Sequence, residues 1–466
     1  MLRERYDPYS LFAAVPQLQL AFEPELAELD RVLDDEPLFR LVRDDLVRRY
    51  PRTADLGRPS TPVEVVLRLL VVKHLYSWSY EDTERFVADS LVLRRFCRLA
   101  LEPVPHHTTL LRWANLIRPA TMHRLLDRVV ALAHAARVTR GRQLRTGSTV
   151  VETDVHHPSD STLLADGVRV LSRLVGRARA VVGAAVAAAG ALFRDRTRAA
   201  KKLSRAIGAT MARGRERAEQ RRRDLYDRLL AVAQASRRQA ERVRRVLDDA
   251  PGAAANRLRA ALDRFAPLVD RVVDQTTRRV RRGEPVPAAE KVLSLFAPHT
   301  ALIQRGKARQ PTEFGARVVL DEVDGGIVSR DDVLPGNPPD ARSVPTSLAH
   351  HRTRFGRPPT PLAGDRGTYS PENERTAQQA GVTRVALPKP GHTTPDRRAH
   401  ERQRWFRRAQ RFRSGIEGRI SLLRRRFGWR RYRYHGAAGL ERWVGWGVLA
   451  HDRRVVARAA ARRQAA

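Results

Sequence analysis

The spacing of apolar and polar positions predicts that the chain begins with helices. Residues 1–60 mix Pro, Asp and Leu without a firm period, and we expect an N-terminal helical arm there. Thr61-Pro62-Val63-Glu64 then supplies an N-cap residue, a proline at the first helical position and an acidic first turn, ahead of an apolar run. Further helix starts at Ser79 and Thr108 predict a helical domain over residues 61–140 with a helix-turn-helix-like layout. That layout suits a DNA-binding or dimerisation domain and a plain helical bundle equally.

A different pattern begins at Ser148. Residues 148–155 are rich in β-branched side chains and predict the first strand of a sheet. From 163 to 290 the apolar residues step by three and four, which predicts long helices packed against each other, with a turn at Pro251-Gly252. We therefore expect an antiparallel helical arm over residues 163–290, inserted after the first strand. Its stripes are Leu225, Leu229, Val232, Ser236, Ala240, Val243 and Leu247, and Leu258, Leu262, Phe265, Val269 and Val272.

Strand signals return after the insertion and then alternate with helices. The expected strands are 301–303, 317–323, 327–329, a short one ending at Asp365, and 384–387; the expected helices are 343–355, one from Ser370, and a long C-terminal one. This alternation predicts the α/β class, with a mixed sheet built from residues 141–162 and 291–450. Residues 451–466 are expected to form a basic C-terminal tail.

The charge points to a polyanionic partner. The chain carries 88 basic and 51 acidic residues, a formal net charge of +37, and only six of the basic residues are lysines. Because the planar guanidinium of arginine matches phosphate well, nucleic acid is the first choice of partner and an acidic membrane surface the second.

Cysteine content and hydropathy narrow the class of protein. Cys97 is the single cysteine, which excludes a disulfide scaffold or a cysteine-rich zinc site and favours a reducing, intracellular setting. The longest uncharged apolar run, 180–193, is shorter than the roughly 20 residues that span a bilayer. We expect a cytoplasmic, nucleoid-associated protein with no membrane partner and no small-molecule cofactor.

Two acidic residues are candidates for metal chemistry. Asp365 ends a predicted strand and precedes a glycine turn, a position typical of functional sites in open α/β sheets; a turn aspartate that bonds its own backbone is the alternative. Glu417 lies among arginines, and its alternative is a helix salt bridge. Phosphodiester cleavage needs little beyond two divalent ions held by carboxylates from distant parts of the chain.

The segment that contains Glu417 is expected to contact DNA. Residues 401–433 hold 13 arginines and two acidic residues, interleaved with aromatic side chains that suit stacking on bases, although some of these rings must belong to the core. The predicted DNA contacts are Arg413, Arg419, Arg424, Arg425, Trp405 and Lys389.

Several motifs together resemble a known family. Arg413, Glu417 and Arg424 have the spacing of the Tyr-x2-Arg-x3-Glu-x6-Lys signature of DDE insertion-sequence transposases, with Gln410 in the place of the tyrosine and Arg424 in that of the lysine. The segments 63–97, 108–115, 149–161 and 306–315 resemble the ISNCY-type transposases. The resemblance implies an RNase H-like catalytic core, two Mg²⁺ (or Mn²⁺) ions, DNA cleavage and strand transfer at terminal inverted repeats, and a homo-oligomer on DNA. It makes Asp365 the second and Glu417 the third catalytic and metal-binding acid.

The chain departs from the family pattern at the first acid. Gly147 occupies the position where the family has an aspartate. Glu152 and Asp154 follow five and seven residues later, on the opposite face of an extended strand by alternation, so that Asp154 is at most a weak substitute. His106-His107 stands where the family has acidic residues. The histidine pairs 156–157 and 350–351 are further candidates for metal ligands, although adjacent histidines on a strand point to opposite faces.

Three functions follow from these residues. The first is a transposase that binds inverted repeats and cleaves DNA, impaired by Gly147. The second is a catalytically inactive DNA-binding transposase remnant. The third, an arginine-rich structural nucleic-acid protein, does not explain the spacing around Glu417.

Overall fold

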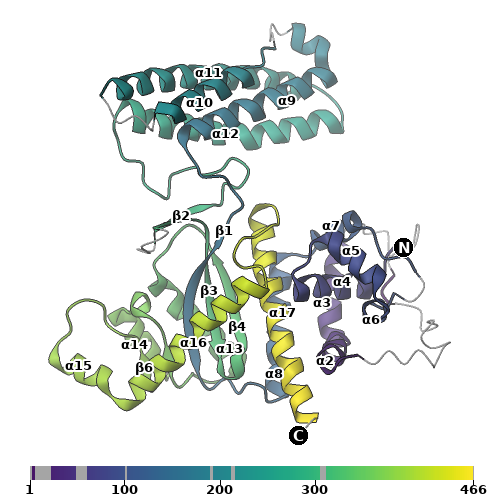
Figure 1. The fold of residues 1–466 in the computed structure, drawn as a ribbon, viewed down its shortest axis with the longest axis vertical. Helices are drawn as coiled ribbons and strands as arrows, with labels where there is room; N and C mark the ends of the chain where they lie inside the picture. The colour runs from purple at the N-terminus through teal and green to yellow at the C-terminus, as the bar shows by residue number, and fades with distance from the viewer. Residues whose placement is uncertain are drawn as a thin grey trace. The chain divides into compact units, whose positions relative to one another are not determined.

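The computed structural model describes residues 3–5, 22–48, 60–99, 102–188, 193–210, 216–304 and 311–464. These residues form two units (Figure 1): an α/β unit made of 1–152 and 316–466, and a bundle unit made of 153–315. The mixed α/β class expected from the sequence is confirmed. In the described residues, no helix carries a stretch long and apolar enough to cross a bilayer.

The α/β unit begins with helices. They are α2 (Pro24–Leu33), α3 (Glu36–Val47), α4 (Val63–Tyr76), α5 (Tyr80–Asp89), α6 (Leu91–Phe96), α7 (His107–Ala114) and α8 (Pro119–Ala135). The predicted helix start at Ser79 is confirmed, because Ser79 is the N-cap of α5 and forms a capping box with Asp82. The predicted cap at Thr61 is wrong, because Pro62 is the N-cap of α4 and makes no side-chain cap bond. Helix α4 is buried along nearly its whole length, so the other helices pack around it.

The sheet of this unit has the strand order β4-β3-β1-β5-β6. Its strands are β1 (Leu144–Glu152), β3 (Thr312–Val323), β4 (Val328–Leu334), β5 (Leu362–Ala363) and β6 (Val385–Ala386). Strands β1, β5 and β6 run parallel, whereas β3 and β4 pair antiparallel. Strand β1 begins four residues before the predicted Ser148, which places Gly147 inside the strand.

The remaining helices of this unit follow the sheet strands. They are α13 (Ser343–Phe355), α14 (Pro371–Gln379), α15 (Pro395–Arg402), α16 (Arg404–Arg426) and α17 (Gly436–Gln464), with the 3-10 turns η1 (Asp324–Gly326), η2 (Asp340–Arg342) and η3 (Arg366–Thr368). Helix α16 crosses one face of the sheet and contacts β1, β5 and β6 (Figure 1). Residues 451–464, expected as a separate basic tail, continue α17 instead, and His451, Asp452 and Arg453 are buried there. This C-terminal part of α17 packs on the unit, because Val456 and Ala457 are also buried in its core.

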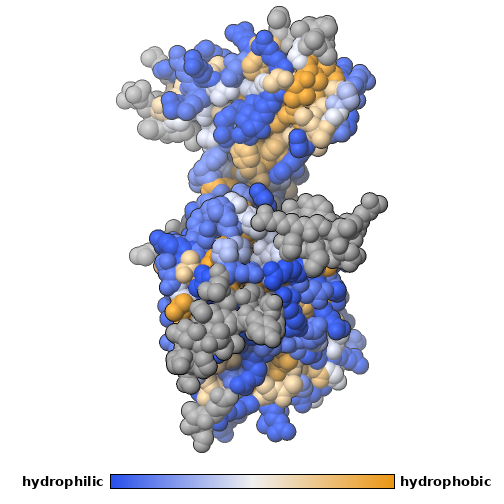
Figure 2. All heavy atoms as spheres, turned by 90° about the vertical axis from the view of Figure 1, so that its right-hand side faces the viewer, coloured by the Kyte–Doolittle hydropathy of each residue, from blue (hydrophilic) through white to orange (hydrophobic). Residues whose placement is uncertain are grey.

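The bundle unit is the inserted arm. It contains α9 (Asp160–Ala188), α10 (Thr197–Thr210), α11 (Glu216–Asp248) and α12 (Ala253–Arg281), with β2 (Ala301–Gln304) paired antiparallel to the first residues of β3. The stripes on α11 and α12 form the core as predicted, including Leu229, Leu247 and Val269, and the turn falls at Pro251-Gly252. The described residues of this unit form four helices, and the predicted stripes lie on two of them, α11 and α12. Figure 2 shows an apolar area on this unit among hydrophilic side chains.

A buried ion network joins α16 to the sheet. The fully buried carboxylate of Glu322, on β3, accepts hydrogen bonds from Arg145 of β1 at 2.6 Å and from Arg419 of α16 at 3.0 Å. Arg419 also contacts His451 of α17, whose Nδ1 lies 2.8 Å from Asp452 Oδ1. Burial lowers the pKa of His451 to about 3, so this imidazole stays neutral. Because each charge in the network has a partner of opposite sign or a hydrogen bond, α16 is held in one register on the sheet.

A second buried carboxyl makes the stability of this unit depend on pH. Burial, aided by Asp332 and Asp452 and opposed by His123 and Arg330, raises the pKa of Asp331 on β4 to about 6. An unfolded aspartate has a pKa near ~4, so the folded chain holds this proton more tightly. The group therefore destabilises the fold progressively as pH rises from about 4 to about 6, and fully above that.

Replacement of Asp331 by Asn removes this penalty. We expect Asp331→Asn to raise the free energy of unfolding by about 1–3 kcal/mol at pH 7 and to leave it unchanged near pH 4, measured by urea unfolding at both pH values. The control is Glu372→Gln on α14, an exposed acid that does not contribute to the pKa of Asp331 and that should show no gain at pH 7. A gain of equal size at both pH values would contradict the assignment.

Candidate active site at the end of strand β5

Asp365 follows the carboxyl end of β5 and uses its two carboxylate oxygens differently. Oδ1 accepts a hydrogen bond from the backbone N–H of Thr368 at 3.1 Å and caps η3. This is the turn role that the sequence offered as the alternative for Asp365. Oδ2 instead faces α16 and accepts from Arg413 at 3.3 Å. The side chain is 34% exposed, so Oδ2 is accessible to a ligand. The turn role and a ligand role are therefore compatible in this residue.

Glu417 projects from α16 toward the same guanidinium. Its Oε1 lies 3.2 Å from Arg413 Nη2, the same nitrogen that contacts Asp365. One cationic nitrogen thus stands between two carboxylates from different elements. Glu417 is 61% exposed. Its ion pair with Arg413, four residues earlier on the same helix, is the helix salt bridge given as the alternative in the sequence.

Gly147 lies beside these two acids. Strands β1 and β5 are parallel, with Leu144 opposite Leu362 and Arg145 opposite Ala363. Continued for two residues, this register brings Gly147 level with Asp365. A Cβ atom on Gly147 would lie 3.1 Å from Cγ2 of Ile416, the residue before Glu417. Position 147 is therefore close in register to Asp365 and packs against the residue before Glu417.

The residue in the tyrosine's place fastens the helix to the strand ends. The side-chain amide of Gln410 donates to the carbonyl of Gly364 at 3.2 Å and to that of Ala386 at 2.7 Å. Gly364 immediately precedes Asp365, and Ala386 ends β6. Gln410 thereby sets the height of α16 relative to Asp365. The sequence shows this residue only as a departure from the family signature, although a partly buried amide beside two strand ends can donate to both of them.

The predicted DNA-contacting residues have different surroundings. Arg419 is held by Glu322 and His451 and is only 18% exposed, which argues against a DNA contact for it. Arg424 donates to the carbonyl of Val150 at 2.8 Å. Arg425 is exposed on the outer face of α16, and Lys389 is half-buried beside Glu401, which accepts from the Lys389 backbone N–H.

Trp405 belongs to a surface groove, which is separate from Asp365. The groove is lined by Gln143, Thr360, Pro361, Arg384, Gln403, Arg404, Trp405, Arg408, Ala409 and Phe412. Other aromatic rings of the same segment, Phe406, Phe427, Trp429 and Tyr432, are buried in the core. The interleaved rings therefore divide into structural ones and the two exposed to the groove, Trp405 and Phe412.

The alternative ligands are placed elsewhere. Glu152, at the end of β1, lies 3.6 Å from Arg431, and Asp154 belongs to the bundle unit. His351 contacts the carbonyl of Gly141, while His350 lies 3.4 Å from Asp127. Within the described ranges, neither the 156–157 nor the 350–351 pair joins a group of three metal-ligating side chains, so the reading of these pairs as a metal centre is not supported.

Comparison with known proteins identifies the N-terminal helices. Residues 16–116 match the family model described as "Transposase domain (DUF772)". This part of the chain, less than half of its length, is therefore similar to a transposase domain. The match spans α2 to α7 and supports a transposase function with DNA as partner. No curated protein and no solved structure matches the chain.

The packing of Gly147 against α16 is open to a direct test. Ile416→Ala removes the side chain that a Cβ at 147 would meet, and alone it should cost about 2–5 kcal/mol through the cavity it leaves. In a Gly147→Ala background the added methyl group partly fills that cavity, so the cost of Ile416→Ala should fall by at least ~0.5 kcal/mol. A double-mutant cycle by urea unfolding measures this coupling.

Strict additivity would contradict the placement of position 147. The matched control is Ile420→Ala, one turn further along α16 and also buried. Its cost should not depend on the residue at 147.

Proposed function

We propose that this protein is a DDE-type transposase of the ISNCY kind, which binds terminal inverted repeats and whose cleavage and strand-transfer activity is impaired by Gly147. The observation that carries the proposal is that position 147 is close in register to Asp365 and packs against the residue before Glu417. The mixed sheet supports an RNase H-like core, because a site at the carboxyl ends of parallel strands is typical of open α/β sheets.

The oxygen donors of this site suit a divalent metal ion, although one of the three expected carboxylates is missing. Asp365 Oδ2 and Glu417 Oε1 are hard oxygen donors on either side of a position already used by a cation, the Arg413 guanidinium. These two residues would hold Mg²⁺ or Mn²⁺, and the bound ion would supply Lewis-acid activation of a phosphate oxygen. Two carboxylates suffice for one ion, whereas a second ion needs the carboxylate that Gly147 lacks.

Residues of the protein itself would position the DNA phosphates. Arg413 is 19% exposed, and it would leave its two carboxylates for a phosphate oxygen when a metal ion takes its place. Gln410 keeps Asp365 and Glu417 at a fixed separation throughout, because its bonds go to backbone carbonyls of the sheet. This fixed separation is the preorganisation that such a reaction requires.

Basic surfaces on each unit support DNA binding. In the α/β unit the groove beside Trp405 presents Arg384, Arg404 and Arg408. In the bundle unit, burial lowers the pKa of Arg196, and the charges of Arg194, Arg238 and Arg242 lower it further. Like charges held this close favour binding of a polyanion, which relieves their repulsion.

A catalytically inactive DNA-binding remnant is the second candidate. It is favoured by one observation: Arg413 already neutralises both acids, and Gly147 offers no third. Both candidates predict DNA binding that weakens steeply with salt, so that binding does not separate them.

Cleavage of a labelled inverted-repeat end in Mg²⁺ or Mn²⁺ separates the two candidates. We expect the native chain to cleave weakly or not at all and Gly147→Asp to cleave at least ~100-fold faster, since one metal-binding carboxylate is restored. Adding Glu417→Gln to Gly147→Asp should abolish the gain. The matched control is Glu372→Gln on α14, an exposed acid outside the site, which should keep it.

Each result decides the matter. Cleavage by the native chain at the rate of Gly147→Asp would show that another residue completes the site. Failure of Gly147→Asp to cleave, with inverted-repeat binding retained, would favour the inactive remnant.

A further inference from the structure

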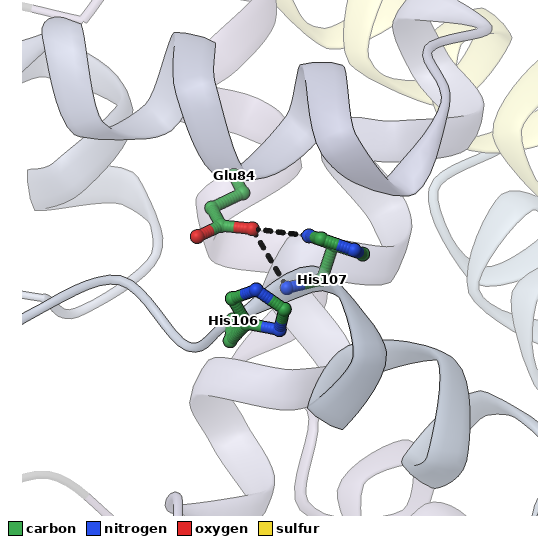
Figure 3. A group of neighbouring side chains, drawn as sticks. All are labelled: Glu84, His106 and His107. Carbon is green, nitrogen blue, oxygen red and sulfur yellow. Dashed lines mark hydrogen bonds and ion pairs between the residues drawn. The ribbon is translucent and has the colours of Figure 1, made fainter.

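Outside the candidate active site, three metal-ligating side chains meet where α7 begins (Figure 3). Glu84 comes from α5, His106 is the N-cap of α7 and His107 is its first residue. One ligand atom from each of the three lies within 4.8 Å of the others. Adjacent histidines on a strand would point to opposite faces, but here the chain turns into a helix between them, so both rings reach Glu84.

Hydrogen bonds already orient these side chains. Glu84 Oε2 accepts from the backbone N–H of His107 at 2.8 Å and lies 2.8 Å from Nδ1 of the same residue. His106 Nδ1 lies 2.9 Å from the Thr108 hydroxyl, and the two imidazole rings lie against each other with centroids 4.0 Å apart. Because Glu84 Oε2 faces Nδ1 of His107, an ion shared by these two groups would bind His107 through Nδ1 and replace the proton between them. Nε2 on the other side of the same ring lies 3.9 Å from Glu81 Oε1, and a carboxylate that orients a histidine through its other nitrogen is a common support of zinc ligands.

We propose that Glu84, His106 and His107 bind one Zn²⁺ ion that fastens the start of α7 to α5. Two imidazoles and a carboxylate are a donor set that zinc favours over Mg²⁺, and a tetrahedral ion has a fourth position left for water.

The electrostatics and access of the site suit a cation. Two carboxylates, those of Glu84 and Glu81, lie beside the His107 imidazole. His106 is exposed and the other two side chains are about 30% exposed, so an ion enters from solvent without opening the domain. The site lies far along the sequence from Asp365 and Glu417, and its ion would hold helices together rather than take part in cleavage.

Direct metal binding tests the proposal on the full chain without an affinity tag. Zn²⁺ titrated against a chromophoric chelator should show one tight site per chain, Co²⁺ should give the intense visible absorption of a four-coordinate ion, and Mg²⁺ should not compete. His106→Asn should raise the Kd for Zn²⁺ at least tenfold. Asn is also a good N-cap residue, so this variant keeps the start of α7 intact. Glu84→Gln should weaken binding as well.

The control is His392→Asn, an exposed histidine outside the group, which should leave the Kd unchanged. Equal Kd values for native and His106→Asn protein, with circular dichroism showing that both are folded, would overturn the proposal, as would a chain that binds no Zn²⁺ at micromolar concentrations. Because the readout is binding without DNA, its failure leaves the proposed cleavage function untouched.

Discussion

The arrangement of the candidate active site depends on the buried carboxylate of Glu322. This residue sits on β3, fully buried, and holds Arg145 of β1 and Arg419 of α16 at the same time. Removal of one member would leave unpaired charge in the interior, which typically costs about 3–5 kcal/mol. The network therefore fixes which face of α16 lies on the sheet. Glu417, two residues before Arg419, takes its position from that constraint, and the amide of Gln410 fixes the other end of the helix against the ends of β5 and β6.

Charge balance explains how two acids coexist at the exposed end of β5. Asp365 and Glu417 share the Arg413 guanidinium, which offsets their mutual repulsion in the absence of metal. A third carboxylate at 147 would add negative charge beside them and would press on Ile416, whose Cγ2 would lie 3.1 Å from the new Cβ. Glycine at this position relieves both problems, and under the proposed function it also leaves the metal site without one of its three carboxylates. Stability of the metal-free fold and completeness of the metal site thus make opposite demands on residue 147.

Much of the fold could be predicted from the sequence, because local signals determine it. The capping box at Ser79, the helix 343–355 and the turn at Pro251-Gly252 all rest on residues within a few positions of each other. Long-range contacts could not be predicted in this way. Nothing near Arg419 in the sequence indicates that this side chain bonds to Glu322 and His451. Likewise, nothing near His106 indicates that Glu84 lies next to it in the fold. For the same reason the sequence predicts a separate basic tail from residue 451. In the structure α17 continues past this residue, and packing buries His451, Asp452 and Arg453.

The most direct test of the central claim is to locate manganese in crystals of the Gly147→Asp protein bound to an inverted-repeat end. Anomalous scattering identifies Mn²⁺ without reference to the protein model. We expect one Mn²⁺ at Asp365 and Glu417, with Arg413 turned toward DNA phosphate, and a second Mn²⁺ beside the new carboxylate at 147. An Arg413 guanidinium still bridging Asp365 and Glu417, with no manganese at either acid while DNA is bound, would contradict it.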